Sequence, residues 1–228
     1  MEILDAIRTR RSIRAFKPDP VPREVLAELV DVCRWAPSGR NAQPWHFAVL
    51  GGAALDEVKA RLDEKVRTSW DGSSLTNRNP DIPRTAPYPD SLLPRMESLR
   101  QRISSILLPP GAENLDERRA EYRAKGQRFH DAPNAIVIYC DDSSATVMGS
   151  VGIVSQTLCL AALAFGLGTC IMGGSVMWPE LYREFLGIPE GMPIATSIAI
   201  GYVDSDDPIN SFERVREPLD SLVEWHGI

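Results

Sequence analysis

The sequence is poor in the residues that build metal and disulfide sites. Its three histidines, at positions 46, 130 and 226, lie far apart and form no His-Glu-x-x-His pattern, so we expect no metal site. Its four cysteines include no Cys-x-x-Cys pair and lie in apolar or helical stretches. Such cysteines are typical of buried free thiols in a reducing compartment, so we expect a cytoplasmic protein.

Three glycine motifs that mark common catalytic folds are also missing. There is no Gly-x-x-x-x-Gly-Lys-Ser/Thr loop, and Ile171 follows Gly166 and Gly168 where Gly-x-Gly-x-x-Gly needs a third glycine. No Gly-x-Ser-x-Gly elbow occurs either. These absences argue against a P-loop, a Rossmann nicotinamide site and a serine-hydrolase elbow.

Positive charge is outweighed by negative charge. The 228 residues carry a net charge of −6, which argues against general affinity for nucleic acid or for an anionic membrane. The apolar fraction of 43% and the charged fraction of 25% are ordinary for a globular protein, and we expect one domain over residues 1–228. Residues Met1–Arg14 lack the apolar core of a secretory signal.

One long stretch, Met148–Gly168, carries no charged residue and is long enough to span a bilayer. Its flanks lack the Lys/Arg anchors and aromatic belts of a membrane segment. We therefore expect a fully buried core helix, apolar all round because other elements surround it. Its small residues, such as Gly149 and Gly152, would also suit a subunit interface.

Hydrophobic spacing predicts helices that alternate with short strands, which favours a layered α/β or α+β arrangement. The expected helices cover 2–8, 22–36, 53–66, 96–108, 113–129, 148–165 and 178–186, and the expected strands cover 45–50, 135–140, 169–172 and 194–202. Between them, residues 70–111 are rich in proline, Asp, Asn and Ser. Because so long an irregular stretch in a domain is usually functional, we interpret it as a lid over a site.

The densest cationic cluster is Arg10-Arg11-Ser12-Ile13-Arg14. Its three guanidinium groups could converge on a phosphate if the chain turns at Ser12, with the hydroxyl completing the cage. On its own the cluster is equally typical of a solvated basic patch.

A second segment, 36–47, has a polar turn, Pro37-Ser38-Gly39-Arg40-Asn41, that runs into Gln43-Pro44-Trp45. Turn amides, a hydroxyl and a carboxamide can hydrogen-bond the edge of a heteroaromatic ring, and Trp45 can add an aromatic wall. Gly173-Gly174 would let the backbone approach such a ring closely. For the turn Pro37-Ser38-Gly39-Arg40-Asn41, the alternative is a loop that merely ends a helix.

Taken together, these segments resemble the FMN-dependent nitroreductase family. The residues that carry the resemblance are Arg10-Arg11-Ser12-x-Arg14, Ala36-Pro37-Ser38-Gly39-x-Asn41-x-Gln43-Pro44-Trp45-x-Phe47, Gly166-Leu167-Gly168-Thr169, Met172-Gly173-Gly174, Ala199-Ile200-Gly201-Tyr202 and Arg216-x-Pro218-Leu219. Only 70–111 lacks a recognisable counterpart. The resemblance implies an α+β nitroreductase-like three-layer fold, with a central mixed, mostly antiparallel sheet flanked by helices. It also implies an intertwined homodimer with an exchanged C-terminal tail.

The resemblance further implies FMN as the cofactor, with no catalytic side chain because the flavin does the chemistry. The cofactor-binding residues that it implies are Arg10, Arg11, Ser12, Arg14, Pro37, Ser38, Asn41, Gln43, Gly173, Gly174, Arg214 and Arg216. The backbone amide of Gly174 would lie near flavin N5, and Pro37, Ser38 and Asn41 would reach the flavin of the second subunit.

The implied activity is two-electron, ping-pong reduction of a small nitroaromatic or quinone-like compound with NADH or NADPH. Lid residues Arg84, Tyr88 and Arg95 are candidates for contacting the substrate. Reductive dehalogenases of the same fold are an alternative, but they usually have Glu-Pro-Trp in place of Gln43-Pro44-Trp45 and a lid Glu followed four residues later by Tyr, a spacing absent here. A flavin-cleaving enzyme of the same fold and a non-catalytic flavin-binding sensor also fit the resemblance.

Overall fold

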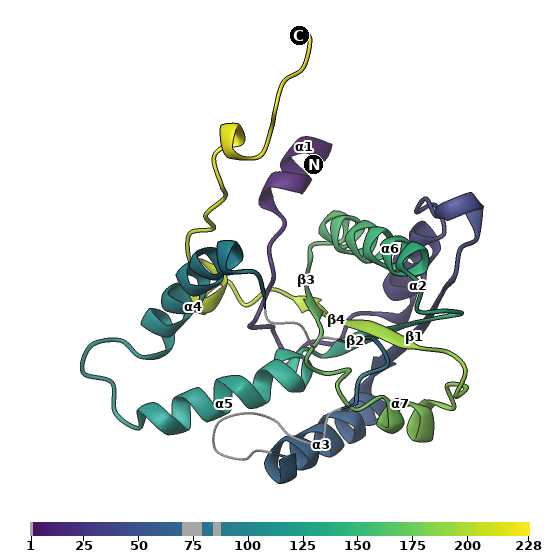
Figure 1. Ribbon diagram of the computed structural model, residues 1–228. Helices are drawn as coiled ribbons and strands as arrows, with labels where there is room; N and C mark the ends of the chain where they lie inside the picture. Colours follow the sequence, from purple (N-terminus) through teal and green to yellow (C-terminus); the bar gives the residue numbers. More distant parts are fainter. Residues whose placement is uncertain (1, 70–78, 84–87) are drawn as a thin grey trace.

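A four-stranded sheet separates two layers of helices (Figure 1). The computed structural model describes residues 2–69, 79–83 and 88–228. The strands β1 (Trp45–Gly51), β2 (Asn134–Cys140), β3 (Leu167–Met172) and β4 (Ile194–Tyr202) lie in the order β1-β2-β4-β3, and each neighbouring pair is antiparallel. A parallel bridge between Ser12 and Thr169 extends the sheet beyond β3. The expected three-layer α+β arrangement is confirmed.

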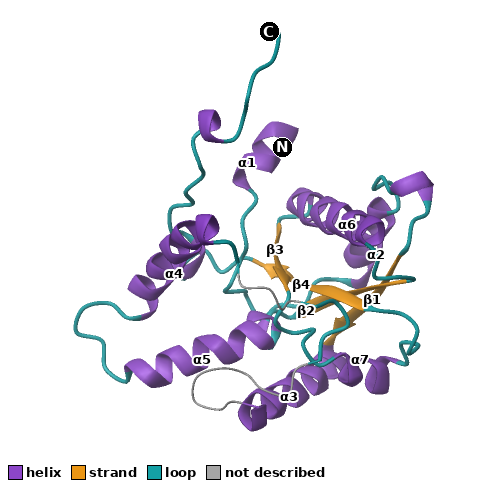
Figure 2. Ribbon diagram, viewed as in Figure 1, coloured by secondary structure: helices purple, strands orange, loops and turns teal. Residues whose placement is uncertain are grey.

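Helices cover both faces of the sheet because the two central strands are apolar on both sides. On one face lie α2 (Arg23–Cys33) and α6 (Ala145–Ala164), whose Leu29 and Leu158 are buried with Ile138 of β2. On the other face lie α3 (Gly52–Ser69) and α7 (Pro179–Leu186), which belong to a second core with Trp178 (Figure 2).

The apolar helix α6 is not surrounded on all sides, so the expectation of full burial was wrong for the single chain. Val151, Val154 and Leu158 are buried, whereas Gly152 is exposed and Ile153 is 43% exposed. By length and composition alone, α6 could cross a membrane. In the fold it packs against α2 and β3, and its remaining side is an open apolar face.

The proline-rich region leads into two helices, α4 (Leu93–Leu107) and α5 (Leu115–Gln127), that extend outward from the sheet beyond β3 (Figure 1). A short turn, η2 (Asp90–Leu92), precedes α4. Residues 79–83 are anchored to the body of the protein, because Asp81 accepts hydrogen bonds from Arg183 Nη2 and from the Ile194 amide, both at 2.8 Å.

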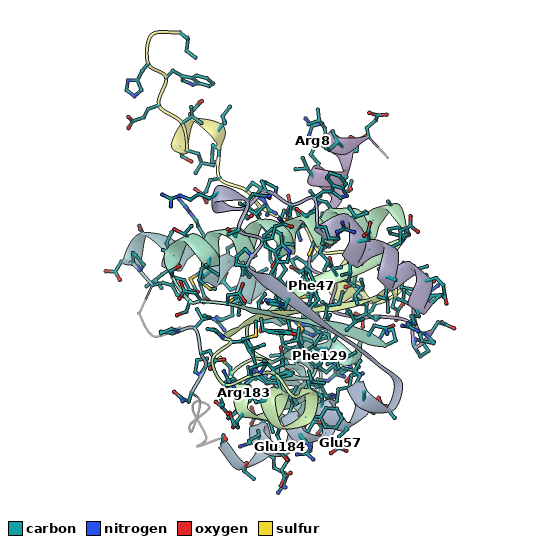
Figure 3. The ribbon with its side chains drawn as sticks, turned by 90° about the vertical axis from the view of Figure 1, so that its right-hand side faces the viewer. Arg8, Phe47, Glu57, Phe129, Arg183 and Glu184 are labelled. Carbon is teal, nitrogen blue, oxygen red and sulfur yellow. The ribbon has the colours of Figure 1, made fainter. Side chains whose placement is uncertain are left out.

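Both ends of the chain project from the body. Helix α1 (Ile3–Thr9) buries none of its residues, and Figure 3 shows Arg8 on it, far from Phe129 in the packed interior. The C-terminal segment follows β4 through two turns, η4 (Pro208–Asn210) and η5 (Leu219–Ser221), and then extends away. Leu219, Leu222 and Trp225 on this tail are each more than half exposed.

Candidate functional site

The segment Arg10–Arg14 is fixed against the edge of the sheet. The Ile13 amide donates to the Thr169 carbonyl at 2.9 Å, next to the Ser12–Thr169 bridge. Gly168 permits this approach, because a Cβ at that position would lie 2.6 Å from Ile13 Cγ1. The extended backbone therefore turns the three arginines toward one hollow instead of spreading them around a helix.

Phe212 holds Arg11 in this hollow. The Arg11 Nη2 donates to the Phe212 carbonyl at 2.7 Å, and its guanidinium lies 5.0 Å from the centre of the Phe212 ring. Burial, together with the charges of Arg214 and Arg14, lowers the pKa of Arg11. Its Nε is buried and has no hydrogen-bond partner among the described residues. A buried donor beside like charges calls for an anionic ligand.

The hollow is a pocket of about 270 Å³ with a strongly cationic lining. Seven arginines face it: Arg10, Arg11, Arg14, Arg95, Arg102, Arg214 and Arg216. Two of them, both on α4, are neutralised, because Arg102 pairs with Glu213 at 2.9 Å and Arg95 with Glu217 at 3.2 Å. Within the described ranges, the other five pair with no carboxylate. The pocket has the chemistry of a phosphate site.

The C-terminal segment closes this pocket. Arg214 donates to the carbonyl of Arg8 at 2.7 Å and to that of Arg10, while Arg216 donates to the Val215 carbonyl at 2.9 Å. The structure thus brings together six of the residues that the resemblance implies for the cofactor, namely Arg10, Arg11, Ser12, Arg14, Arg214 and Arg216. It also places Arg95, predicted to contact substrate, beside them. Sequence reasoning missed Phe212 and Arg102, for which no local motif gives a signal.

Gly173 and Gly174 directly follow β3, the strand whose Thr169 pairs with Ser12. A Cβ at Gly174 would lie 2.8 Å from Gln127 Nε2 and 2.9 Å from Gln127 Oε1 at the end of α5. Only glycine leaves the Gln127 carboxamide in place. Gln127 also has no signal in the sequence, since one glutamine in a charged helix is unremarkable.

The second predicted segment lies elsewhere in the chain. Its turn η1 (Gly39–Asn41) is held by Ser38 Oγ, which accepts from the Gln43 amide at 2.9 Å, and by Ser150 of α6, whose Oγ accepts from the Gly39 amide at 3.4 Å. These contacts lie in the first turns of α6, whereas Ser12 pairs with the strand that follows its last turn (Figure 1). From Ser150 to the last residue of α6, Ala164, about 21 Å of helix therefore separates the two segments.

The turn itself is conformationally unusual. Arg40, Asn41 and Gln43 have φ of 53°, 57° and 48°. Such left-handed backbone in non-glycine residues costs free energy and is concentrated at functional sites. The single chain thus presents Pro37, Ser38, Asn41 and Gln43 in a strained turn, remote from the arginine pocket.

The other two residues predicted to contact the substrate are Arg84 and Tyr88. Tyr88 is 59% exposed, and Arg84 lies outside the described residues. No group of His, Cys, Asp and Glu suited to a metal ion occurs in the part of the chain that is described.

Comparisons of sequence and of structure find known proteins that are similar to this chain. The model of the Nitroreductase family matches residues 7–202. Nitroreductase NfnB of Mycolicibacterium smegmatis is 31% identical over 93% of this chain and 88% of its own length. A 4-nitrobenzoate reductase of a Nocardioides species is 30% identical over 98% and 90%. The crystal structure of the FMN-dependent NfnB from Mycobacterium smegmatis in complex with NADPH superposes with a TM-score of 0.87, at 26% identity, over 99% of this chain and 100% of that one.

Proposed function

Because the chain belongs to the Nitroreductase family, we propose that it is an FMN-dependent oxidoreductase that uses NADH or NADPH to reduce nitroaromatic or quinone-like compounds. The observation that carries this proposal is the convergence on one pocket of five arginines that pair with no carboxylate among the described residues. The two relatives reduce nitro compounds by name, and the NfnB structure holds NADPH.

The residues present fit FMN. Arg10, Arg11, Ser12, Arg14, Arg214 and Arg216 would hold its phosphate end, where the unpartnered Arg11 Nε offers a further donor. Gly173 and Gly174 would lie along the ring, where a side chain would obstruct it. When bound, FMN supplies the two-electron chemistry between nicotinamide and substrate. The chain orients it, and the guanidinium groups favour negative charge near them.

The same proposal includes a homodimer. The Pro37–Gln43 turn lies too far from the arginine pocket to meet it within one chain, and a second copy could supply it. Three open apolar surfaces support association: the α6 face with Gly152 and Ile153, helix α1 and the tail around Leu222 and Trp225. At the far side of the sheet, β1 pairs on one side only among the described residues, and an exchanged tail could join its other side.

The substrate class follows from the relatives, and the lid residues Arg84, Tyr88 and Arg95 stay proposals for contacting it. Four free, buried cysteines favour a reducing, cytoplasmic location.

Spectroscopy of the purified protein tests the proposal. We expect a yellow protein whose flavin absorbance bleaches with NADPH or NADH under anaerobic conditions and returns on addition of 4-nitrobenzoate. Arg14→Ala should lose FMN, whereas Arg119→Ala, on the exposed side of α5, should keep it. A colourless protein that FMN does not reconstitute would contradict the proposal. Bleaching without recovery on a panel of nitroarenes and quinones would instead favour a sensor.

A further inference from the structure

The end of α5 lies against Gly174, and the proposed function gives no role to this contact. Gln127 is the last residue of α5, and both polar atoms of its side chain lie within 3 Å of the Cβ position of Gly174. Its Oε1 is buried and accepts no hydrogen bond from any described residue. Because a buried acceptor without a donor costs free energy, such an atom indicates a partner that the chain does not supply.

Gln127 is held in position by a strained turn directly after it. Phe129, His130 and Asp131 have φ of 64°, 50° and 57°, which is unfavourable for three consecutive residues with side chains. Strain of this kind persists only where the surroundings enforce it, and it is concentrated at functional sites.

Arg128 enforces this geometry. Its Nε donates to Asp131 at 2.6 Å, its Nη1 donates to Asp63 of α3 at 3.1 Å, and its Nη2 donates to Glu121. Lys59 of α3 adds a bond from Nζ to the Ala132 carbonyl at 2.8 Å. The end of α5 is therefore tied to α3 and to the turn, which fixes the backbone of Gln127 near Gly174.

We propose that Gln127 Oε1 accepts a hydrogen bond from the ring of reduced FMN beside Gly174 and thereby favours the reduced state. The inference rests on the proposed function, in which Gly173 and Gly174 would lie along the ring, and on the resemblance, which implies that the Gly174 amide lies near flavin N5. Oxidised N5 carries no hydrogen, whereas hydride transfer from the nicotinamide puts two electrons and one hydrogen there and leaves oxidised nicotinamide. A carboxamide oxygen can accept from an N–H but not bond a bare nitrogen. Gln127 itself gains and loses no proton.

The midpoint potential of the bound flavin tests this inference. In Gln127→Met, which keeps the length of the side chain but removes the carboxamide, the equilibrium constant for FMN reduction should fall about tenfold. For a two-electron couple this equals a shift of about 30 mV to more negative potential. Affinity for oxidised FMN should change by less than about twofold, because the acceptor has no donor on oxidised N5.

Gln101→Met on α4 is the matched control, since that amide donates to Glu97 at the surface. If Gln127→Met fails to fold, Gln127→Asn should show the same loss, because its shorter side chain falls short of Gly174. An unchanged potential in a folded, FMN-loaded Gln127 variant would overturn the inference alone. Failure of the unaltered protein to bind FMN would overturn the proposed function, and the inference with it.

Discussion

Phe212 contacts Arg11 in two ways at once, through its carbonyl oxygen at 2.7 Å and through the face of its ring at 5.0 Å. The same ring lies 5.9 Å from the guanidinium of Arg14. One aromatic residue of the C-terminal segment thus positions two of the arginines that line the pocket, although about two hundred residues separate them in sequence.

Replacing this ring should weaken FMN binding. Phe212→Leu keeps the carbonyl but removes the cation–π contact, which is worth about 0.5–2 kcal/mol, so the dissociation constant of FMN should rise roughly 2- to 30-fold. Quenching of FMN fluorescence measures it. Phe185→Leu removes a comparable ring contact with the remote Arg61 and should leave FMN affinity unchanged. Equal effects of the two variants would contradict the assigned role.

Gly168 should be required for the arginine segment to reach the sheet. In Gly168→Ala the new methyl group would lie 2.6 Å from Ile13 Cγ1 and 2.7 Å from Val203 Cγ2. We expect a loss of about 1–3 kcal/mol in the free energy of unfolding, together with weaker FMN binding. Urea denaturation and FMN titration check the two effects. Gly191→Ala, which meets open space, is the control.

The Asp81–Arg183 pair should stabilise the protein measurably. Both side chains are mostly buried, and Asp81 also accepts from the Ile194 amide. Asp81→Ala should cost about 2–3 kcal/mol in urea denaturation, below the range for a fully buried pair because Glu190 lies 3.4 Å from Arg183 and can compensate. Asp31→Ala breaks the exposed pair with Arg34 and should have little effect. A negligible loss in Asp81→Ala would refute the anchoring role of residues 79–83.

His130 should make the apoprotein less stable in mild acid. Burial, aided by the charge of Arg14, lowers the pKa of His130 from 6.5 to about 4. Below pH 6.5 the His130 side chain takes up a proton in the unfolded chain but stays neutral in the folded chain. The free energy of unfolding therefore falls as the pH drops from 6.5 toward 4, by up to about 3 kcal/mol. Urea denaturation at pH 7.5 and 4.5 should show a smaller pH effect in His130→Gln than in the unaltered protein. The same pH effect in both would rule out His130 as the cause.

Charging the open face of α6 should separate the proposed dimer. Ile153→Lys introduces an ammonium group among exposed apolar residues, whereas Leu115→Lys does so on α5, away from that face. Light scattering after gel filtration should report a monomer for the first and a dimer for the second, and the monomer should retain less FMN. A dimeric Ile153→Lys protein would show that α6 does not form the interface.

The regular elements were largely predictable because their signals are local. Leu26, Leu29 and Cys33 recur at helical spacing, and α2 indeed begins after Pro22. Helix α4 begins three residues earlier than its periodicity suggests, since Pro94 is accommodated in its first turn. The small residues of α6 favoured a subunit interface, but which side of the helix stays open could not be predicted, because an apolar sequence does not indicate which chain covers it.

From the residues alone the site was predictable only where they are close in sequence, whereas Arg214 and Arg216 were named through the family resemblance. Arg10, Arg11 and Arg14 form a visible cluster, but the pairing that aims them depends on Thr169 and Gly168. Gln127 was missed because its position depends on the left-handed turn at Phe129–Asp131 and on Arg128, which are set by tertiary contacts. The sequence therefore indicates the phosphate-binding chemistry of the pocket, whereas long-range packing determines which other residues lie beside it.

The arginine-lined pocket also bears on how fast ligands arrive. A chain of net charge −6 repels dianions at a distance, yet its cationic groups are gathered in one concave opening. The low-dielectric walls of the pocket focus the positive electrostatic field outward, so a phosphate-bearing molecule is attracted to the opening of the pocket. The negative charge on the rest of the surface repels it. Added salt should slow the association step more than it speeds dissociation. Long-range electrostatic attraction would thus favour phosphate-bearing ligands before they contact the protein.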